Sequence, residues 1–252
     1  MGTLIRLVGA SFNNPDLPVV GLPYTGIRDG LMAAHHFYGS LEESSDLSGN
    51  RSDLIQIGNV EWFPTFLRAG NGYNGFVSMA SDLASRPNDF TICAIVRQNV
   101  DMSTYGMPIN TYSTNGGSAG ANIMIKSGGV RPQAHISQGP VMSGAEMPST
   151  STNWEVGILT AASNGPGADL AWHQPKYGHK WVKTVTEALL HQSNYGGHGS
   201  RWLIGFSDSA AAQDTVDVAY VAIFNRALSD SEVATQYASM KAYAEALGIG
   251  AV

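Results

Sequence analysis

Short apolar runs, each closed by glycine, asparagine or serine, make up most of the chain after residue 30. Runs of this kind, with turn-forming residues between them, are typical of an antiparallel β-sandwich or barrel. The run 215–224 is apolar on both faces in its second half, as expected of a central strand that is covered on each side. We predict about twelve strands on this pattern, at 31–37, 53–58, 75–79, 90–98, 107–112, 122–126, 133–137, 154–160, 169–173, 181–185, 201–206 and 215–224.

A segment near the C-terminus has helical periodicity instead. Ser229 and Glu232 have the spacing of a capping box, in which each side chain bonds the backbone of the other. Gly248 ends the pattern. We therefore predict a helix over 230–247 that packs on its own sandwich. Its apolar face is formed by residues spaced three or four apart, namely Val233, Tyr237, Met240, Ala244 and Leu247.

The first 28 residues are composed differently from the rest. Pro15, Pro18 and Pro23 exclude a helix and favour extended backbone. Apolar residues are still interspersed among them, so the segment is not composed like a flexible linker. We expect an extended attachment arm over residues 1–28, with a short strand at 4–8, followed by one domain over 29–252.

Charge and glycine content narrow the class of protein. Charged residues make up 13% of the 252, against about 25% in an average soluble domain, and 29 residues are glycine. The formal net charge of −6 argues against a nucleic-acid partner, which needs a basic surface. No apolar run reaches the roughly 18 residues of a membrane span, and no signal peptide is visible. We expect a protein that stays in the cytoplasm or leaves it by assembly and lysis.

Histidines and aromatic residues gather between positions 172 and 202. Four of the seven histidines lie there, but their spacings of 6, 12 and 7 match no structural zinc pattern, and the single Cys93 lies in an apolar run. Aromatic rings beside amides favour sugar stacking, with ordinary core and loop aromatics as the alternative. The candidate glycan-binding residues are Trp172, His173, Tyr177, His179, Tyr195 and His198.

A polar segment after the first predicted strand has turn chemistry. Asp46 is placed to accept backbone N–H groups, while Gly49 and Asn50 tolerate a positive φ. We interpret the segment as a structural corner between two strands. A calcium loop is the alternative.

We find no support for catalysis in the short motifs of the chain. Its glycine-rich segments at 72–75 and 116–120 lack the lysine and helix of a phosphate loop. The carboxylates from Asp208 to Asp217 do not have the acid-x-acid spacing that often marks a retaining glycosidase, and Glu42 and Glu43 precede a turn. From this we expect a protein that is not an enzyme and that has no cofactor.

Two of these segments carry a resemblance to a known family. The chain reads Asp-Leu-Ser-Gly-Asn at 46–50 and Asn-Arg-Ala-Leu-Ser at 225–229, before the acidic start of the helix. With the strands between them, residues 30–235 resemble laminin-G-like domains of the concanavalin A-like jelly-roll class. The resemblance implies an antiparallel jelly roll that serves as a binding or structural module. The family's calcium ligands cannot be placed on this chain.

The N-terminus carries a second resemblance. Residues 4–12, followed by Leu17 and Pro18, resemble the opening of tailed-bacteriophage virion proteins that carry such a domain behind an attachment arm. This implies location in a virion, binding to other virion proteins through residues 1–28, and a homo-oligomer, with a trimer favoured. A host-surface glycan is the expected ligand. A free lectin-like module and a glycan-cleaving enzyme are the alternatives.

Overall fold

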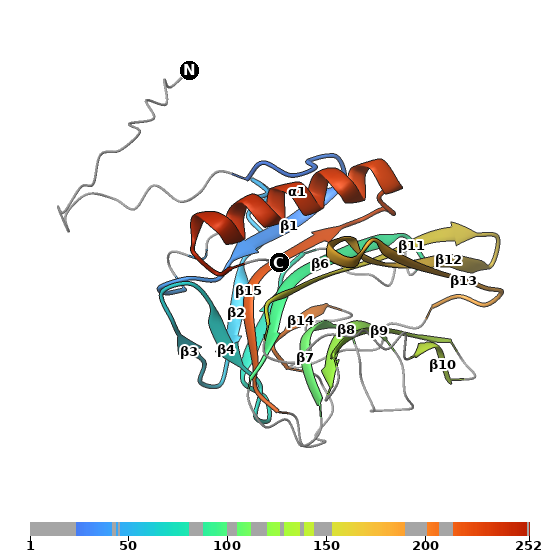
Figure 1. Ribbon diagram of the computed structural model, residues 1–252. Helices are drawn as coiled ribbons and strands as arrows, with labels where there is room; N and C mark the ends of the chain where they lie inside the picture. The colour runs from blue at the N-terminus through green and yellow to red at the C-terminus, as the bar shows by residue number, and fades with distance from the viewer. Residues whose placement is uncertain are drawn as a thin grey trace.

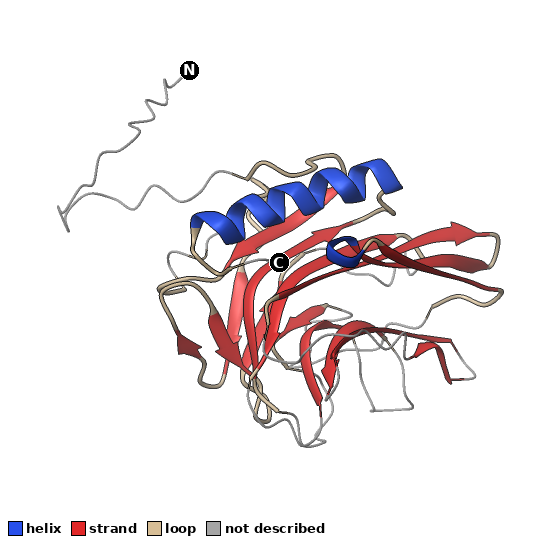
Figure 2. Ribbon diagram, viewed as in Figure 1, coloured by secondary structure: helices blue, strands red, loops and turns tan. Residues whose placement is uncertain are grey.

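Two antiparallel sheets packed face to face form the body of the protein (Figures 1 and 2). This computed structural model describes residues 24–41, 44, 46–80, 88–99, 105–111, 120–126, 129–136, 139–143, 153–189, 201–206, 214–250 and 252. The predicted β-sandwich with one C-terminal helix is confirmed. The predicted strand at 4–8 and most of the predicted arm lie outside the described residues.

The first sheet has eight strands, and β15 and β6 lie at its centre. One of the eight, β1 (Leu31–His36), pairs with β15 beside the main path. The other strands follow the order β13 (His179–Val185), β12 (Gly167–Gln174), β11 (Glu155–Asn164), β6 (Phe90–Gln98), β15 (Val216–Phe224), β4 (Leu67–Ala69) and β3 (Glu61–Trp62).

The second sheet has seven strands and closes the other side of the core. Its order is β10 (Gly139–Ser143), β9 (Gly129–Ile136), β8 (Ala121–Lys126), β7 (Tyr105–Asn110), β14 (Trp202–Ile204), β5 (Gly75–Ser78) and β2 (Leu54–Ile57). Every strand predicted after residue 30 overlaps an observed one. The sequence pattern missed β3 and β4 because two or three residues are too few to alternate, and it missed β10, which begins Gly-Pro.

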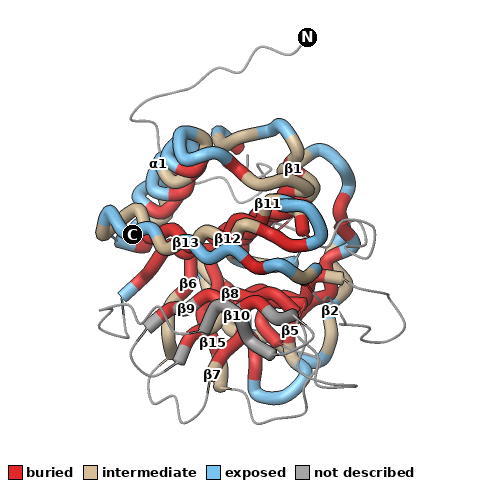
Figure 3. The backbone as a smooth tube through the Cα atoms, turned by 90° about the vertical axis from the view of Figure 1, so that its right-hand side faces the viewer, coloured by how far each residue is buried: buried red, intermediate tan, exposed pale blue. Residues whose placement is uncertain are grey.

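All nine residues of β15 are buried, as the sequence predicts (Figure 3). Val216 and Val218 belong to the core between the sheets, whereas Tyr220 and Phe224 belong to a second core on the outer face of the first sheet. The alternation changes phase between Val218 and Tyr220, where the pairing with β6 has a bulge. Both faces of this strand are therefore covered, one by the second sheet and one by the helix.

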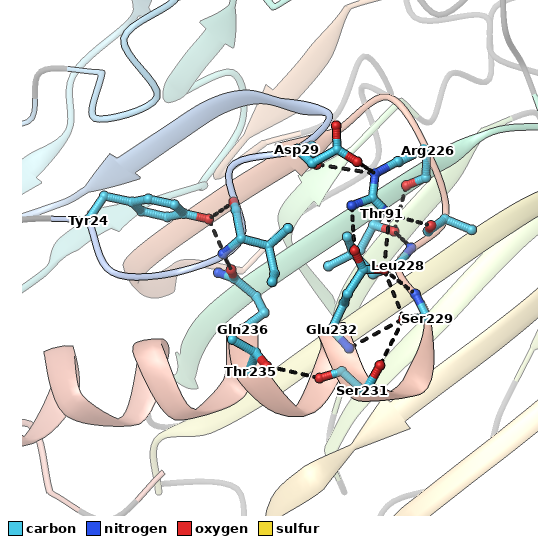
Figure 4. Close-up of polar contacts among 12 residues, drawn as sticks. Tyr24, Asp29, Thr91, Arg226, Leu228, Ser229, Ser231, Glu232, Thr235 and Gln236 are labelled. Atoms are coloured by element: carbon cyan, nitrogen blue, oxygen red, sulfur yellow. Dashed lines mark hydrogen bonds and ion pairs between the residues drawn. The ribbon is translucent and has the colours of Figure 1, made fainter.

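The helix α1 (Asp230–Ala246) covers the outer face of the first sheet (Figure 1). The predicted capping box is present: Ser229 Oγ accepts a hydrogen bond from the Glu232 backbone N–H, and the Ser229 backbone N–H donates to Glu232 Oε2 at 2.8 Å (Figure 4). Of the predicted apolar face, Val233, Met240 and Ala244 are buried, while Tyr237 and Leu247 are half-buried.

Residues 24–28, which the sequence places in the arm, contact the helix α1. The Tyr24 side chain is 7% exposed, and its hydroxyl donates to Gln236 Oε1 on α1 at 2.9 Å (Figure 4). Ile27 donates its backbone N–H to the same oxygen at 3.1 Å, and Thr25 lies 2.8 Å from Ser239 on the same helix. Residues 24–28 therefore belong to the sandwich.

Candidate functional site

The turn between β12 and β13 places a group of aromatic side chains at the edge of the first sheet. The turn is a 3₁₀ helix, η2 (Pro175–Tyr177), and it ends at Gly178 in the left-handed region at φ 66°. Pro175 has the φ of a helix start, and glycine adopts the left-handed φ without strain. The two strands then pair in register, with Gln174 opposite His179 and Trp172 opposite Trp181.

Three rings follow one another around this corner. The centroids of Tyr177 and His179 are 6.2 Å apart, and those of His179 and Trp181 are 5.2 Å apart in an edge-to-face arrangement. His179 is exposed and the other two rings are half-buried. They remain accessible because β13 is the last strand on its side of the sheet, and most of it is exposed, Val182 by 63% (Figure 3).

A buried carboxylate lies behind the first ring. Tyr177 donates its hydroxyl to Glu155 Oε1 at 2.7 Å, and Lys176 Nζ lies 3.5 Å from the same oxygen. Burial, and then the hydrogen bond to Glu155, raise the pKa of Tyr177 to about 12. The phenol therefore stays protonated at neutral pH and acts as a fixed hydrogen-bond donor, which orients its ring.

The same corner holds buried polar atoms without a partner. The second oxygen of Glu155 and both amide atoms of Gln174 make no hydrogen bond. Both residues are buried, Glu155 at 2% exposed and Gln174 at 0%. Buried polar groups nearly always have a partner, and each one left unpaired costs about 1–3 kcal/mol. The corner thus retains hydrogen-bonding capacity for a water molecule or a ligand group.

Two lysines lie on this edge of the sheet, Lys180 and Lys183. Lys180 Nζ lies 2.7 Å from Asp230 at the start of α1 and is largely neutralised there. Lys183, three residues further along β13, is exposed and makes no ion pair among the described residues. The edge therefore combines one exposed and two half-buried rings with a lysine that has no ion-pair partner in the described part of the chain.

The residues predicted to bind glycan do not all lie together in the structure. Tyr177 and His179 come together, whereas Tyr195 and His198 lie outside the described residues. Trp172 and His173 are buried, at 0% and 6% exposed, and are not part of this row of rings. The Trp172 ring packs into the core against Gly157, where an added Cβ would lie 2.3 Å from the ring.

The sequence did not predict that Trp181, Glu155 and Gln174 belong to this corner. Trp181 has a signal in the sequence, since it is two residues from His179 on a strand and therefore on the same face. Glu155 and Gln174 have none, because the fold alone brings the start of β11 and the end of β12 to the same corner.

Asp46 forms the centre of a tight turn. Its Oδ1 accepts the backbone N–H groups of Ala34 and Ser48, each at 3.0 Å, and its Oδ2 accepts the Ser52 N–H at 3.0 Å and the Ser48 hydroxyl at 2.6 Å. Burial acts to raise the pKa of Asp46, but these hydrogen bonds outweigh it and lower the pKa. Both carboxylate oxygens are thus already occupied by protein donors.

The rest of this turn differs from the sequence-based expectation in one respect. Gly49 has the expected positive φ of 85°, but the second such residue is Arg51 at 56°, not Asn50. Asn50 instead donates its side-chain amide to the Leu31 carbonyl at 2.7 Å, which ties the turn to β1.

Comparison with known proteins shows the fold alone. No family model and no curated protein matches the sequence. Among solved structures, the binding domain of botulinum neurotoxin serotype D has a TM-score of 0.60 and 11% identity over 85% of this chain and 52% of its own. Trypanosoma rangeli sialidase in complex with sialic acid has a TM-score of 0.55 and 18% identity over 85% of this chain and 34% of its own.

A third similar structure is the serotype D neurotoxin ligand-binding domain in complex with N-acetylneuraminic acid, with a TM-score of 0.58 and 12% identity over 85% of this chain and 51% of its own. This chain therefore spans between a third and about half of the length of these neighbours.

The comparison corrects one expectation from the sequence. The prediction that the protein is not an enzyme is wrong as an inference, because a sialidase is among the structures that share this fold over 85% of the chain. The lack of support for catalysis in short motifs does not exclude enzymatic activity here. In the part of the chain that is described, no helix is long and apolar enough to cross a membrane. What the structure and these neighbours show in common is an antiparallel β-sandwich fold.

Proposed function

We propose that the protein is a carbohydrate-binding module that holds a sugar at the corner between η2 and β13. The observation that carries this proposal is the row of accessible rings of Tyr177, His179 and Trp181, beside buried hydrogen-bonding groups with no partner. The C–H faces of a sugar pack on aromatic rings, while a few polar groups fix its orientation.

The charge of the corner favours an acidic sugar. Lys183 has no carboxylate partner in the described part of the chain, and the exposed His179 lies on the same strand. A sugar carboxylate would be attracted to the lysine and would accept a hydrogen bond from the histidine ring. Two of the neighbouring structures hold sialic acids, which supports a terminal N-acetylneuraminic acid as the first ligand to test.

We also propose that this module is presented on a bacteriophage particle. The low charge of the chain and the resemblance of residues 1–28 to virion attachment arms support this role. Because residues 24–28 pack on the sandwich, the docking segment is limited to residues 1–23. The particle would carry the module as a homo-oligomer, with a trimer favoured. A free lectin-like module is the alternative.

Isothermal titration calorimetry with 3′-sialyllactose, and with lactose as the uncharged control, tests the binding. We expect sialyllactose to bind at least tenfold more tightly than lactose. His179→Ala is expected to weaken that binding about tenfold, and Val182→Ala, an exposed change on the same strand, to leave it unchanged. Equal binding of the two sugars, or equal effects of the two variants, would contradict the proposal.

Particle location needs a separate experiment. Mass spectrometry of purified phage particles is expected to detect this chain, and deletion of residues 2–23 is expected to abolish its incorporation while leaving the melting temperature unchanged within a few degrees. Absence from the particles, or incorporation of the deleted form, would remove the virion role without affecting the sugar site.

A further inference from the structure

A second polar hollow lies at the opposite lateral edge of the first sheet. Its volume is about 90 Å³, and it lies where β3 and β4 meet the turn that leads into β5. From β13 to β3 the sheet order gives six steps between strands, which is about 29 Å at the usual spacing. One monosaccharide therefore cannot occupy both this hollow and the corner at η2.

The walls of the hollow are held in place by one side chain. Asn74 accepts the Asn59 backbone N–H on its Oδ1 at 2.9 Å and donates its amide to the Asn71 carbonyl at 2.9 Å. Gly58 fits tightly against it, since an added Cβ would lie 2.1 Å from Asn74 Oδ1. Gly70 also donates its N–H to the Asn74 carbonyl at 2.7 Å. A site that is already formed loses little conformational entropy on binding.

The hollow also contains a fixed arginine. Arg68 donates through Nε and Nη2 to the buried Asp217 carboxylate at 2.7 and 3.2 Å, and its guanidinium lies 4.9 Å from the centroid of the Phe63 ring. Its third nitrogen, Nη1, is 3.9 Å from Glu61 Oε2, beyond hydrogen-bonding distance. That nitrogen is therefore a positioned donor facing an acceptor.

The free groups around this pair are neutral amides. Asn59 and Asn71 are exposed, and their side-chain amides make no hydrogen bond to any described residue. This combination of a cation, an anion and neutral amides in the hollow disfavours several classes of ligand. An anion would be repelled by Glu61, a cation by Arg68, and an apolar group would find only Ala69 as a side chain of its own kind. No group of three metal-ligating side chains occurs in the described part of the chain.

We propose that this hollow binds a vicinal pair of hydroxyl groups on a neutral saccharide. One hydroxyl accepts from Arg68 Nη1, its neighbour donates to Glu61, and the amides of Asn59 and Asn71 contact the rest of the ring. The site is independent of the acidic-sugar corner. With both sites present, a branched or surface-bound glycan gains affinity from two contacts on one sandwich.

Nuclear magnetic resonance titration of the full chain tests this site with methyl α-D-mannopyranoside as the probe. Its matched control is the 2,3-O-isopropylidene derivative, in which no vicinal hydroxyl pair remains. We expect saturable shifts of the Asn59 and Asn71 side-chain amide signals with the free mannoside only. Glu61→Gln is expected to weaken this binding about tenfold, because a charged acceptor is replaced by a neutral one.

Variants distinguish this site from the corner at η2. His179→Ala is expected to leave mannoside binding unchanged, whereas Glu61→Gln is expected to weaken it. The second-site proposal is overturned if the mannoside shifts neither amide, if the blocked derivative shifts them equally, or if a correctly folded Glu61→Gln variant binds as well as wild type. None of these results depends on whether sialyllactose binds.

Discussion

Tyr177 donates its hydroxyl to the buried Glu155 carboxylate at 2.7 Å, across the gap between η2 and the first residue of β11. The contact fixes the Tyr177 ring at the entrance of the corner and gives the Glu155 carboxylate a hydrogen-bond donor. Lys176 could not fully replace that donor, because its Nζ is 3.5 Å from the same oxygen. It is a contact between residues 22 apart in the sequence, so no local pattern shows it.

The Tyr177–Glu155 pair should be coupled in stability. Tyr177→Phe leaves a buried carboxylate with less hydrogen bonding and is expected to lower the free energy of unfolding by about 1–3 kcal/mol. Urea denaturation of this variant, of Glu155→Gln and of the double variant gives the coupling energy. Additive effects of the two changes would show that the hydrogen bond contributes nothing to stability.

Burial along α1 should set the cost of truncating its side chains. Met240 is 1% exposed and Leu247 is half-buried, so Met240→Ala is expected to cost about 2–5 kcal/mol and Leu247→Ala less. The exposed Lys241→Ala is the control and should change stability by less than about 0.5 kcal/mol. Urea denaturation that gives equal costs for all three would mean that the helix does not pack on the sheet as described.

Acid should destabilise the protein partly through His36. Its ring stacks on Tyr243 of α1 at 3.9 Å, and burial, followed by the charge of His35, lowers its pKa to about 3. Because the unfolded state binds this proton near pH 6.5 and the folded state does not, stability is full above about pH 6.5 and falls as pH drops toward 3.

One such histidine changes the free energy of unfolding by at most about 1.4 kcal/mol per pH unit. His36→Phe keeps a ring against Tyr243, so we expect its stability to fall less between pH 7 and pH 4.5 than that of wild type, as measured by urea denaturation at each pH. Identical profiles for His36→Phe and wild type would contradict this role.

Calcium should have no effect on the turn at Asp46. Both oxygens of its carboxylate already accept hydrogen bonds from the protein, so chelation with EDTA is expected to leave the melting temperature unchanged within about a degree. Asp46→Ala, by contrast, leaves several backbone donors without their acceptor and should cost about 1–3 kcal/mol. A melting temperature that rises with added calcium would favour the alternative of a calcium loop.

Sequence periodicity predicted the sandwich better than it predicted the site. The nine-residue strand β6 was predicted with both ends correct because a long buried run between turns has one interpretation. The helix start followed from Ser229 and Glu232 alone. Local chemistry of this kind needs no knowledge of distant residues.

Burial of aromatic residues could not be predicted in the same way. Trp172 and Trp181 lie in one aromatic stretch and are direct partners across two strands, yet one is fully buried and the other half-buried, since β13 ends the sheet. Gly157 makes room for the Trp172 ring from a third strand. Which rings reach the surface therefore depends on the strand order, which the sequence pattern does not contain.

Mapping of the sugar contact by nuclear magnetic resonance tests the central claim most directly. In a titration with the methyl α-glycoside of N-acetylneuraminic acid, we expect the His179 ring and Trp181 indole signals to shift and saturate, while the Trp172 indole signal, from a ring buried in the core, stays in place. Shifts confined to other parts of the protein, or no shifts at millimolar sugar, would contradict a glycan site at the corner between η2 and β13.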